Sequence, residues 1–289
     1  MVDPVHSTVS PSSGEAPTGA LTGACSFANL TLPNPLPPEP LALFAEWLNL
    51  AHTLKTQPNP NALTLATIDP DGSPAARIVL ARRVDQQAGT LTFFTNYNSR
   101  KGLALTPVSA NGEPAMSRVA CVFHWDHLDR QVRFEGCVVK ATAAESDAYF
   151  HSRPILSQVA AWASDQSQPI VSREELLRRN DAVEARFGIT RKPAPDGASA
   201  SPEPTTSREA THAADATAIV PEGLIVPRPP HWGGFRVWID RAELWLGHSA
   251  RLHDRGLWQR TITFARGTTS ESSGATPSVS AWSVGRLQP

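Results

Sequence analysis

Three potential cations alternate in a short segment near the C-terminus. Arg251, His253 and Arg255 occupy every second position of "ARLHDR". If this piece is extended, the two-residue period of a strand places all three side chains on one face. The chain of 289 residues has a formal net charge of −1, so it has no general attraction to nucleic acid or to an anionic membrane. We therefore interpret the cluster, beside Trp245, as a local site for an aromatic ring and its oxygen atoms.

Other cations lie at the ends of expected strands. In "ARIVLARR", Arg77 and Arg82 bracket an apolar run. An arginine there must face solvent or find an anion, because burying an unpaired charge is costly. In "TNYNSRKG", Ser99, Arg100 and Lys101 follow a strand and open a short helix, where free N–H groups favour a phosphate. Taken singly, a solvated strand face and an ordinary basic turn are the simpler interpretations.

A third group combines different donors. Tyr149, Arg153 and Ser157 are spaced four apart in "YFHSRPILSQ", so a continuous helix would place them on one face, but Pro154 is expected to split that helix. All three can donate to phosphate oxygens, and the arginine fork can do so bidentately. The alternative is that Tyr149 is simply a core aromatic.

Two further polar residues, Gln166 and Ser167, lie in the loop "ASDQSQ", where ordinary turn chemistry is the alternative. The sequence has no GxGxxG, GxxxxGK[ST], HExxH or GxSxG motif. The dinucleotide-binding, P-loop, zinc-protease and α/β-hydrolase classes therefore lose their usual support.

The elements that must position these residues predict a mainly β architecture with helices. An amphipathic helix over about 40–55 precedes five β-rich runs separated by turn residues. Helices follow over 146–153, 154–164 and 172–188, the last opened by a capping box of Ser172 and Glu175, and strands then return. This order favours an antiparallel sheet or barrel over alternating βαβ units.

Low-complexity tracts divide the chain. Residues 1–38 are expected to be a disordered extension, and 192–218 and 267–278 to be insertions within a single domain at 39–289. The N-terminus lacks the features of a secretory signal, no apolar run is long enough to span a bilayer, and the three cysteines are far apart. These features predict a cytoplasmic protein in a reducing compartment.

From about Leu41 to Pro289 the sequence resembles the pyridoxamine (pyridoxine) 5'-phosphate oxidases, which have the FMN-binding split β-barrel fold. The resemblance is carried, in order, by "RIVLAR", "FFTNYNSRKG", "DRQVRFEG", "YFHSRPILSQ", "SDQSQ", "WGGFRV", "RLHDR" and the final "RLQP". It implies a homodimer with two FMN molecules at the subunit interface. It also implies oxidation of pyridoxamine or pyridoxine 5'-phosphate to pyridoxal 5'-phosphate, with O2 as acceptor and H2O2 as product.

The resemblance assigns roles by position. FMN contacts are implied for Arg77, Ile78, Val79, Leu80, Phe94, Thr95, Arg100, Lys101, Gln131, Gln166, Ser167, Trp245 and Arg255. Substrate binding is implied for Arg82, Tyr149, Arg153, Ser157, Arg251 and His253, of which Arg251 and His253 are the catalytic pair over the pyridine ring.

Three features depart from the family pattern. Arg82 replaces the usual Lys, Leu244 and Leu246 replace Phe and Gln, and the Arg- and Tyr-containing segment upstream of the first helix has no counterpart. Two alternatives stay open: a split-barrel flavin oxidase acting on another aromatic substrate, as in phenazine formation, and a non-catalytic protein that binds FMN or pyridoxal phosphate.

Overall fold

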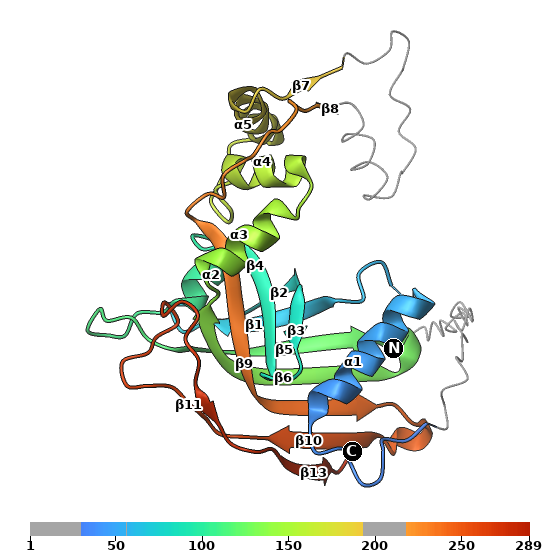
Figure 1. Cartoon of the computed structure of the whole chain (residues 1–289). Helices are drawn as coiled ribbons and strands as arrows, with labels where there is room; N and C mark the ends of the chain where they lie inside the picture. Colours follow the sequence, from blue (N-terminus) through green and yellow to red (C-terminus); the bar gives the residue numbers. More distant parts are fainter. Residues whose placement is uncertain (1–29, 56, 193–217) are drawn as a thin grey trace, which may run out of the picture.

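The computed structural model describes residues 30–55, 57–192 and 218–289 (Figure 1). Most of the expected extension at 1–38 and of the expected insertion at 192–218 lies outside the described residues. In chain order the elements are α1 (Pro40–Leu54), β1 (Ala62–Ile68), β2 (Pro74–Leu80), β3 (Arg83–Asp85), β4 (Thr90–Asn96), α2 (Arg100–Leu105), β5 (Ser117–Trp125), η1 (Asp126–Leu128), β6 (Arg130–Lys140), α3 (Ala143–His151), α4 (Ile155–Ala163), α5 (Arg173–Arg186), β7 (Thr190–Arg191), β8 (Ala218–Ile219), β9 (Trp232–Leu246), η2 (Ser249–Arg251), β10 (Asp254–Gln259), β11 (Ile262–Thr263), β12 (Ser278–Val279) and β13 (Ser283–Leu287).

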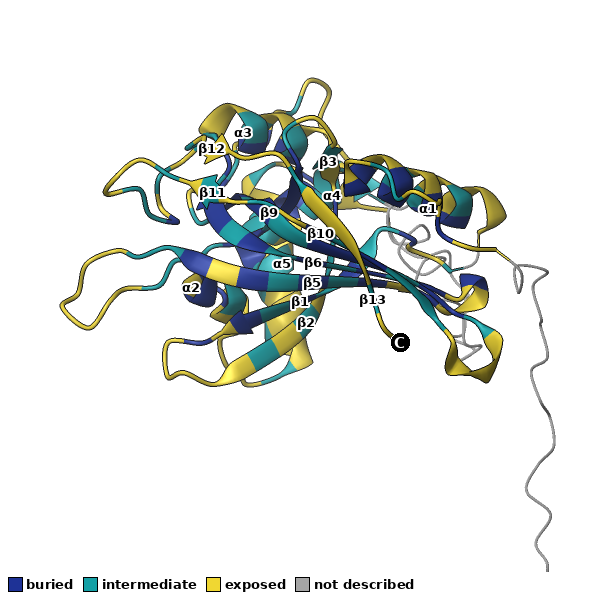
Figure 2. Ribbon diagram, turned by 90° about the horizontal axis from the view of Figure 1, so that it is seen from below, coloured by how far each residue is buried: buried dark blue, intermediate teal, exposed yellow. Residues whose placement is uncertain are grey.

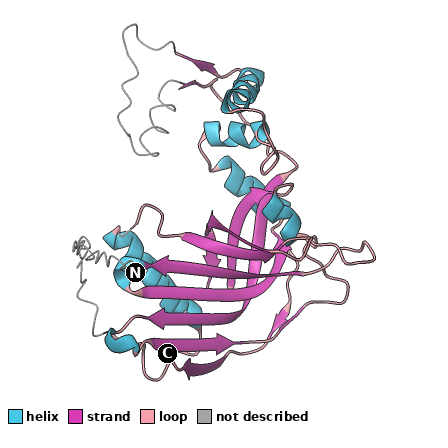
Figure 3. Cartoon of the chain, turned by 180° about the vertical axis from the view of Figure 1, so that it is seen from behind, coloured by secondary structure: helices cyan, strands magenta, loops and turns pink. Residues whose placement is uncertain are grey.

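One antiparallel sheet organises the molecule. Its strands follow the order β13-β10-β9-β6-β5-β1-β2, and β4 pairs with both β3 and β9. Strand β9 is the centre of this arrangement, because β6 runs along one edge while β4 and then β10 share the other. The backbone N–H of Arg82, just after β2, donates to the carbonyl of Thr92 in β4 at 2.9 Å, so the sheet returns on itself. The predicted mainly β architecture with peripheral helices is confirmed (Figures 1 and 3).

A bulge bends the two longest strands. The register of β6 against β9 shifts between Glu135 and Gly136. A Cβ atom at Gly136 would lie 2.0 Å from the carbonyl oxygen of Trp238, so a residue with any side chain would force the strands apart. Such bulges strengthen the local bend and twist, and here they let β9 curve around the core.

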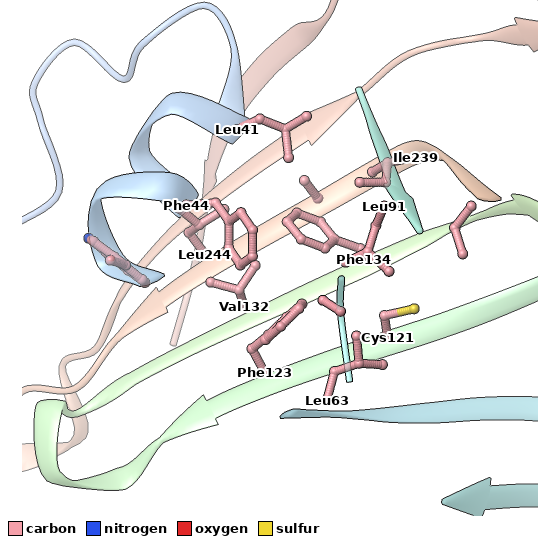
Figure 4. Close-up of a cluster of buried hydrophobic side chains, with 14 of the residues drawn as sticks. Leu41, Phe44, Leu63, Leu91, Cys121, Phe123, Val132, Phe134, Ile239 and Leu244 are labelled. Carbon is pink, nitrogen blue, oxygen red and sulfur yellow. The ribbon is translucent and has the colours of Figure 1, made fainter. Parts of the chain in front are cut away.

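The core fills the concave side of the sheet (Figure 4). Strand residues alternate between buried and partly exposed positions, as in β1 and β6 (Figure 2). Helix α1 lies across this concave side, and the Phe44 ring lies 4.9 Å from those of Phe123 and Phe134. Burying each such ring contributes about 2–3 kcal/mol, so α1 is fixed by its apolar face.

The middle of the chain forms a helical layer at one end of the sheet (Figure 1). Helix α3 begins with a capping box of Thr142 and Glu145, and Pro154 separates α3 from α4, as expected. Helix α5 begins at Arg173 with Ser172 as its N-cap, whose side chain accepts the N–H of Glu175. These helices pack around a second, smaller apolar cluster: Phe150, Val159, Ile189, Val226 and Trp232.

Residues 30–39 run along the opposite end of the sheet. The N–H of Leu32 donates to Asp254 Oδ2 at 2.8 Å, and Trp258 Nε1 donates to the carbonyl of Pro37 at 2.8 Å. The Leu32 side chain is buried, so the described residues up to 38 pack on the domain and do not belong to the expected extension. Among the described residues, no helix combines the length and apolar character that crossing a membrane requires.

Candidate active site

A cavity of about 360 Å³ opens where strands β2 and β4 meet helices α2, α3 and α4. Segments that are far apart in the sequence meet there. Because of this position, residues at the ends of β2 and β4 make up much of the lining. The lining residues are Ile78, Val79, Leu80, Arg82, Phe94, Thr95, Asn96, Lys101, Tyr149, Arg153, Ala160, Ala161, Ser164, Gln166 and Trp232. The structure thus brings together most of the residues predicted for the cofactor and for the substrate phosphate.

Lys101 enters this cavity from the first turn of α2. Its Nζ donates to Gln166 Oε1 at 2.8 Å, to Thr95 Oγ1 at 3.1 Å and to Ser99 Oγ at 3.3 Å. All three acceptors are neutral. Burial lowers the pKa of Lys101, and the nearby Arg77 lowers it further. An anion in the cavity would therefore accept a hydrogen bond from Lys101 and would also offset the cost of burying the lysine charge.

Arg153 and Arg82 supply two more cations. The Arg153 guanidinium carbon lies 4.8 Å from the Trp232 ring centroid, and its Nη1 is buried with no hydrogen-bond partner. Burial lowers the pKa of Arg153, with Arg82 adding to the effect. The Arg82 guanidinium carbon lies 5.6 Å from the Tyr149 ring centroid. Within the described part of the chain, neither arginine forms an ion pair with a carboxylate.

An aromatic wall closes one side of the cavity. The rings of Phe94 and Tyr149 stack at 4.1 Å, and those of Phe94 and Trp232 at 5.6 Å. Sequence reasoning assigned no role to Trp232. The available signal was its place at the head of the "WGGFRV" motif, but its contact with Arg153 exists only in the folded chain.

Four predicted residues lie beside the cavity rather than in its lining. Arg77 donates to Thr67 Oγ1 at 2.7 Å on the neighbouring strand, and Arg100 is paired with the Asp69 carboxylate. Ser157 lies one helical turn before Ala161 on α4. Ser167 follows Gln166 in a left-handed conformation, with φ of 73°.

A second group of predicted residues forms elsewhere. Gln131 in β6 pairs with Trp245 in β9, which pairs with Arg255 in β10, so the three lie side by side across the sheet. Arg255 is fixed by the buried Glu243, whose Oε1 accepts Nη2 at 2.7 Å and Nε at 3.0 Å. We name Gln131, Trp245, Arg251, His253 and Arg255 the strand-end group.

The predicted extended geometry of "ARLHDR" is wrong. Strand β10 begins only at Asp254, and Arg251 ends the short helix η2 with φ of 60°. Residues 250 and 251 both adopt the left-handed region, so the chain turns instead of alternating. His253 still reaches the group, with its ring 4.7 Å from that of Trp245. Its Nδ1 accepts the N–H of His248 at 3.2 Å, which places the proton of the neutral ring on Nε2.

The cavity and the strand-end group lie at opposite ends of β9. Trp232, its first residue, lines the cavity, and Trp245 is its second-last residue. A straight strand of 15 residues would span about 50 Å, and the curvature seen in Figure 1 shortens this without joining the ends. One chain therefore does not bring both groups to a single site.

Comparisons with known proteins agree on the family. Residues 50–187 match the family described as pyridoxamine 5'-phosphate oxidase, and residues 232–289 match the pyridoxine 5'-phosphate oxidase C-terminal dimerisation region. The chain is 39% identical over 254 residues to a pyridoxine/pyridoxamine 5'-phosphate oxidase of Burkholderia orbicola (strain MC0-3), covering 87% of this chain and 90% of the relative. It is 43% identical over 216 residues to the enzyme of the same name from Bordetella avium (strain 197N), covering 75% and 80%.

Among solved structures, the fold is similar to that of PhzG from Burkholderia lata 383 in complex with tetrahydrophenazine-1-carboxylic acid. The TM-score is 0.63 at 23% identity, with 91% of this chain and 99% of that chain covered. The likeness supports the split-barrel fold predicted from the sequence. The family match and the relatives at about 40% identity show that this chain belongs to the pyridoxamine 5'-phosphate oxidase family.

Proposed function

We propose that the protein is an FMN-dependent oxidase that converts pyridoxamine 5'-phosphate or pyridoxine 5'-phosphate to pyridoxal 5'-phosphate, with O2 as acceptor and H2O2 as product. The observation that carries the proposal is the cavity lined by Lys101, Arg82 and Arg153, none of which has a carboxylate partner among the described residues. Cations gathered in a partly buried space without acidic partners favour binding of anions such as phosphate.

The residues around Lys101 fit the phosphate and ring system of FMN. Lys101 and Arg100 would bind the phosphate, while the backbone and side chains of Arg77–Leu80, with Phe94, Thr95, Gln166 and Ser167, would hold the rest of the cofactor. Bound FMN supplies the hydride acceptor and the route for electrons to O2. The part of the protein is to orient the two reactants and to exclude water between them.

Arg153 is the central residue for the substrate phosphate. It lines the cavity without a carboxylate partner among the described residues, and its guanidinium carbon lies 4.8 Å from the Trp232 ring centroid, which restricts where the cation can lie. Arg82, Tyr149 and Ser157 would complete the phosphate contacts. Arg82 can bind two phosphate oxygens at once where the family's usual Lys provides a single ammonium, so the substitution keeps the charge and adds a directional contact.

A second copy of the chain would complete the site. The strand-end group lies far from the cavity in one chain, and all of its members except Gln131 fall within residues 232–289, the part that matches a dimerisation region. Strands β2 and β1 also expose apolar residues: Ile78 of β2, in the cavity lining, is 64% exposed, and Ile68 at the end of β1 is 58% exposed. In the proposed homodimer, Gln131, Trp245 and Arg255 of one copy contact FMN in the cavity of the other.

Arg251 and His253 would then lie over the substrate ring. The His248 amide fixes the His253 ring so that Nε2 carries the proton and can donate to an oxygen on the ring. Arg251 is exposed in the single chain, which leaves its guanidinium available to cover a ligand in the other copy. Both residues position the substrate so that its reacting carbon faces the hydride acceptor.

The visible spectrum of the purified protein tests the proposal. We expect a bound flavin whose absorption bleaches under anaerobic conditions when pyridoxamine 5'-phosphate is added, and returns when O2 is admitted. A yellow protein that stays oxidised with both B6 phosphates would overturn the oxidase proposal. Bleaching by a reduced phenazine precursor instead would favour the second substrate class, and no bleaching with either would favour a binding protein.

A further inference from the structure

Residues 267–278, which we name the C-terminal strap, are not a simple loop expansion. Their composition, "GTTSESSGATPS", predicts a tolerated insertion with little apolar burial. In the structure the strap instead lies against the ends of β5 and β6 and against the start of α3. Two of its residues, Ser270 and Pro277, are buried.

Ser270 is the anchor of the strap. It is fully buried, its N–H donates to the Ala115 carbonyl at 3.1 Å, and its carbonyl accepts the N–H of Lys140 at 2.8 Å. Its hydroxyl also accepts the N–H of Ser117 at 2.8 Å. The serine thus satisfies backbone groups at the beginning of β5 and at the end of β6, which would otherwise be buried without partners.

The strap next contacts the start of α3. Ser273 Oγ donates to the Ala141 carbonyl at 2.8 Å, and the N–H of Gly274 donates to the Lys140 carbonyl at 2.8 Å. A Cβ atom at Gly274 would lie 2.6 Å from Cγ2 of Thr142, the N-cap of α3. Gly274 of the strap therefore packs closely against Thr142, the N-cap residue of the helix that carries Tyr149.

A charged contact extends the strap toward α2. Glu271 forms an ion pair with Lys140, whose Nζ lies 4.4 Å from the ring centroid of Tyr97. The Lys140 side chain is only 21% exposed, held between the carboxylate and the ring. The Tyr97 ring lies 5.3 Å from the Phe235 ring of β9, and the backbone of Tyr97 lies against α2, because a Cβ atom at Gly102 would lie 2.1 Å from the Tyr97 carbonyl oxygen.

We propose that the C-terminal strap is a positioning element for the active site, which fixes α2 through Lys140 and Tyr97 and fixes α3 through Gly274. These two helices carry Lys101 and Tyr149, the residues assigned above to the two phosphates. Lys140 and Glu271 touch neither ligand and act only through Tyr97 and the turn at 96–101. The ligand readouts of this inference rest on the proposed function, whereas its amide-exchange readout does not.

Lys140→Met tests the α2 branch, because it removes the ammonium and keeps most of the stem. The rate of FMN release, followed as recovered flavin fluorescence after dilution of the holoprotein, should rise about twofold to fivefold, the range for a lost cation–π contact. Lys140→Arg should restore the wild-type rate. Amide exchange in α2 should quicken in Lys140→Met even in protein freed of FMN.

A stability control separates positioning from general destabilisation. Leu41→Ala removes buried atoms of α1 in the main core and should lower the melting temperature without changing FMN release, measured well below that temperature. If Leu41→Ala and Lys140→Met accelerate release equally, or if α2 exchange is the same in Lys140→Met and wild type, the α2 branch is refuted.

A matched pair of glycines tests the α3 branch. Gly274 and Gly267 both have positive φ, 70° and 83°, but an added Cβ at Gly267 has nothing within 4 Å. Gly274→Ala should raise KM for pyridoxamine 5'-phosphate and quicken exchange at the start of α3, and Gly267→Ala should do neither. Equal effects of the two changes would show that backbone strain alone is responsible. If wild-type protein binds no FMN, the proposed function fails, and amide exchange alone decides the inference.

Discussion

The cavity and the strand-end group use arginine in opposite ways. In the cavity, Arg153 has a buried Nη1 without a partner and rests on Trp232. In the strand-end group, Arg255 already has a partner, because the buried Glu243 carboxylate takes two of its donors. The first arrangement leaves a partly buried cation without a carboxylate partner, whereas the second pairs the cation and fixes its side chain. This difference fits the proposed roles, in which the cavity binds anionic ligands and the strand-end group presents a preformed surface.

The largest expected effect concerns Arg153, the cavity arginine that has no carboxylate partner among the described residues. Arg153→Ala should raise KM for pyridoxamine 5'-phosphate about 10- to 150-fold, since a hydrogen bond to a charged group contributes about 1.5–3 kcal/mol. Steady-state kinetics with saturating FMN measures this change. Arg178→Ala, at an arginine paired on the exposed face of α5, is the matched control and should leave KM unchanged. An unaltered KM in Arg153→Ala would remove the substrate phosphate from this cavity.

A paired comparison of Lys101 and Arg251 should separate the two regions. Lys101→Ala should lower FMN content of the purified protein about tenfold or more, because it removes a charge-assisted contact to the cofactor phosphate. Arg251→Ala should keep FMN content and lower turnover by a similar factor. Flavin absorbance per protein and kcat at saturating substrate measure the two effects. Equal loss of FMN in both variants would contradict this division of roles.

The smallest expected effect concerns pH. Burial holds the pKa of Lys101 below its ordinary value, so its charge is present below that lowered pKa and is lost as the pH rises through it. FMN affinity of the wild type should therefore weaken with rising pH in the alkaline range. Lys101→Arg, which stays charged, should show a flatter titration. Parallel curves for the two proteins would show that the lysine charge is not what holds the cofactor.

Local patterns in the sequence were sufficient for much of the fold. The apolar spacing of Leu43, Phe44 and Trp47 predicted α1, and Ser99 and Pro154 marked the start of α2 and the break before α4. The order of strands and helices predicted the antiparallel class. These predictions are confirmed because helix caps, prolines and the spacing of apolar residues determine local structure within a few residues of the chain.

Other features depend on contacts that no local pattern encodes. Arg251 adopts a left-handed conformation without a glycine, so the alternation in "ARLHDR" gave the wrong geometry. Trp232 meets Arg153 only after distant segments have packed. The packing of the strap was not predicted for a different reason. Composition indicates how much apolar surface a segment can bury, whereas Ser270 is fixed by hydrogen bonds to the backbone at the ends of two strands.

Subunit mixing tests most directly whether the cavity of one chain and the strand-end group of another form one site. Arg153→Ala and Arg251→Ala proteins are unfolded together, refolded as a mixture and assayed. If each site draws one group from each copy, half of the dimers are mixed and each mixed dimer has one intact site, so about a quarter of wild-type activity should return. If the mixture is no more active than the separate variants, although mixed dimers form, the two groups do not meet across an interface.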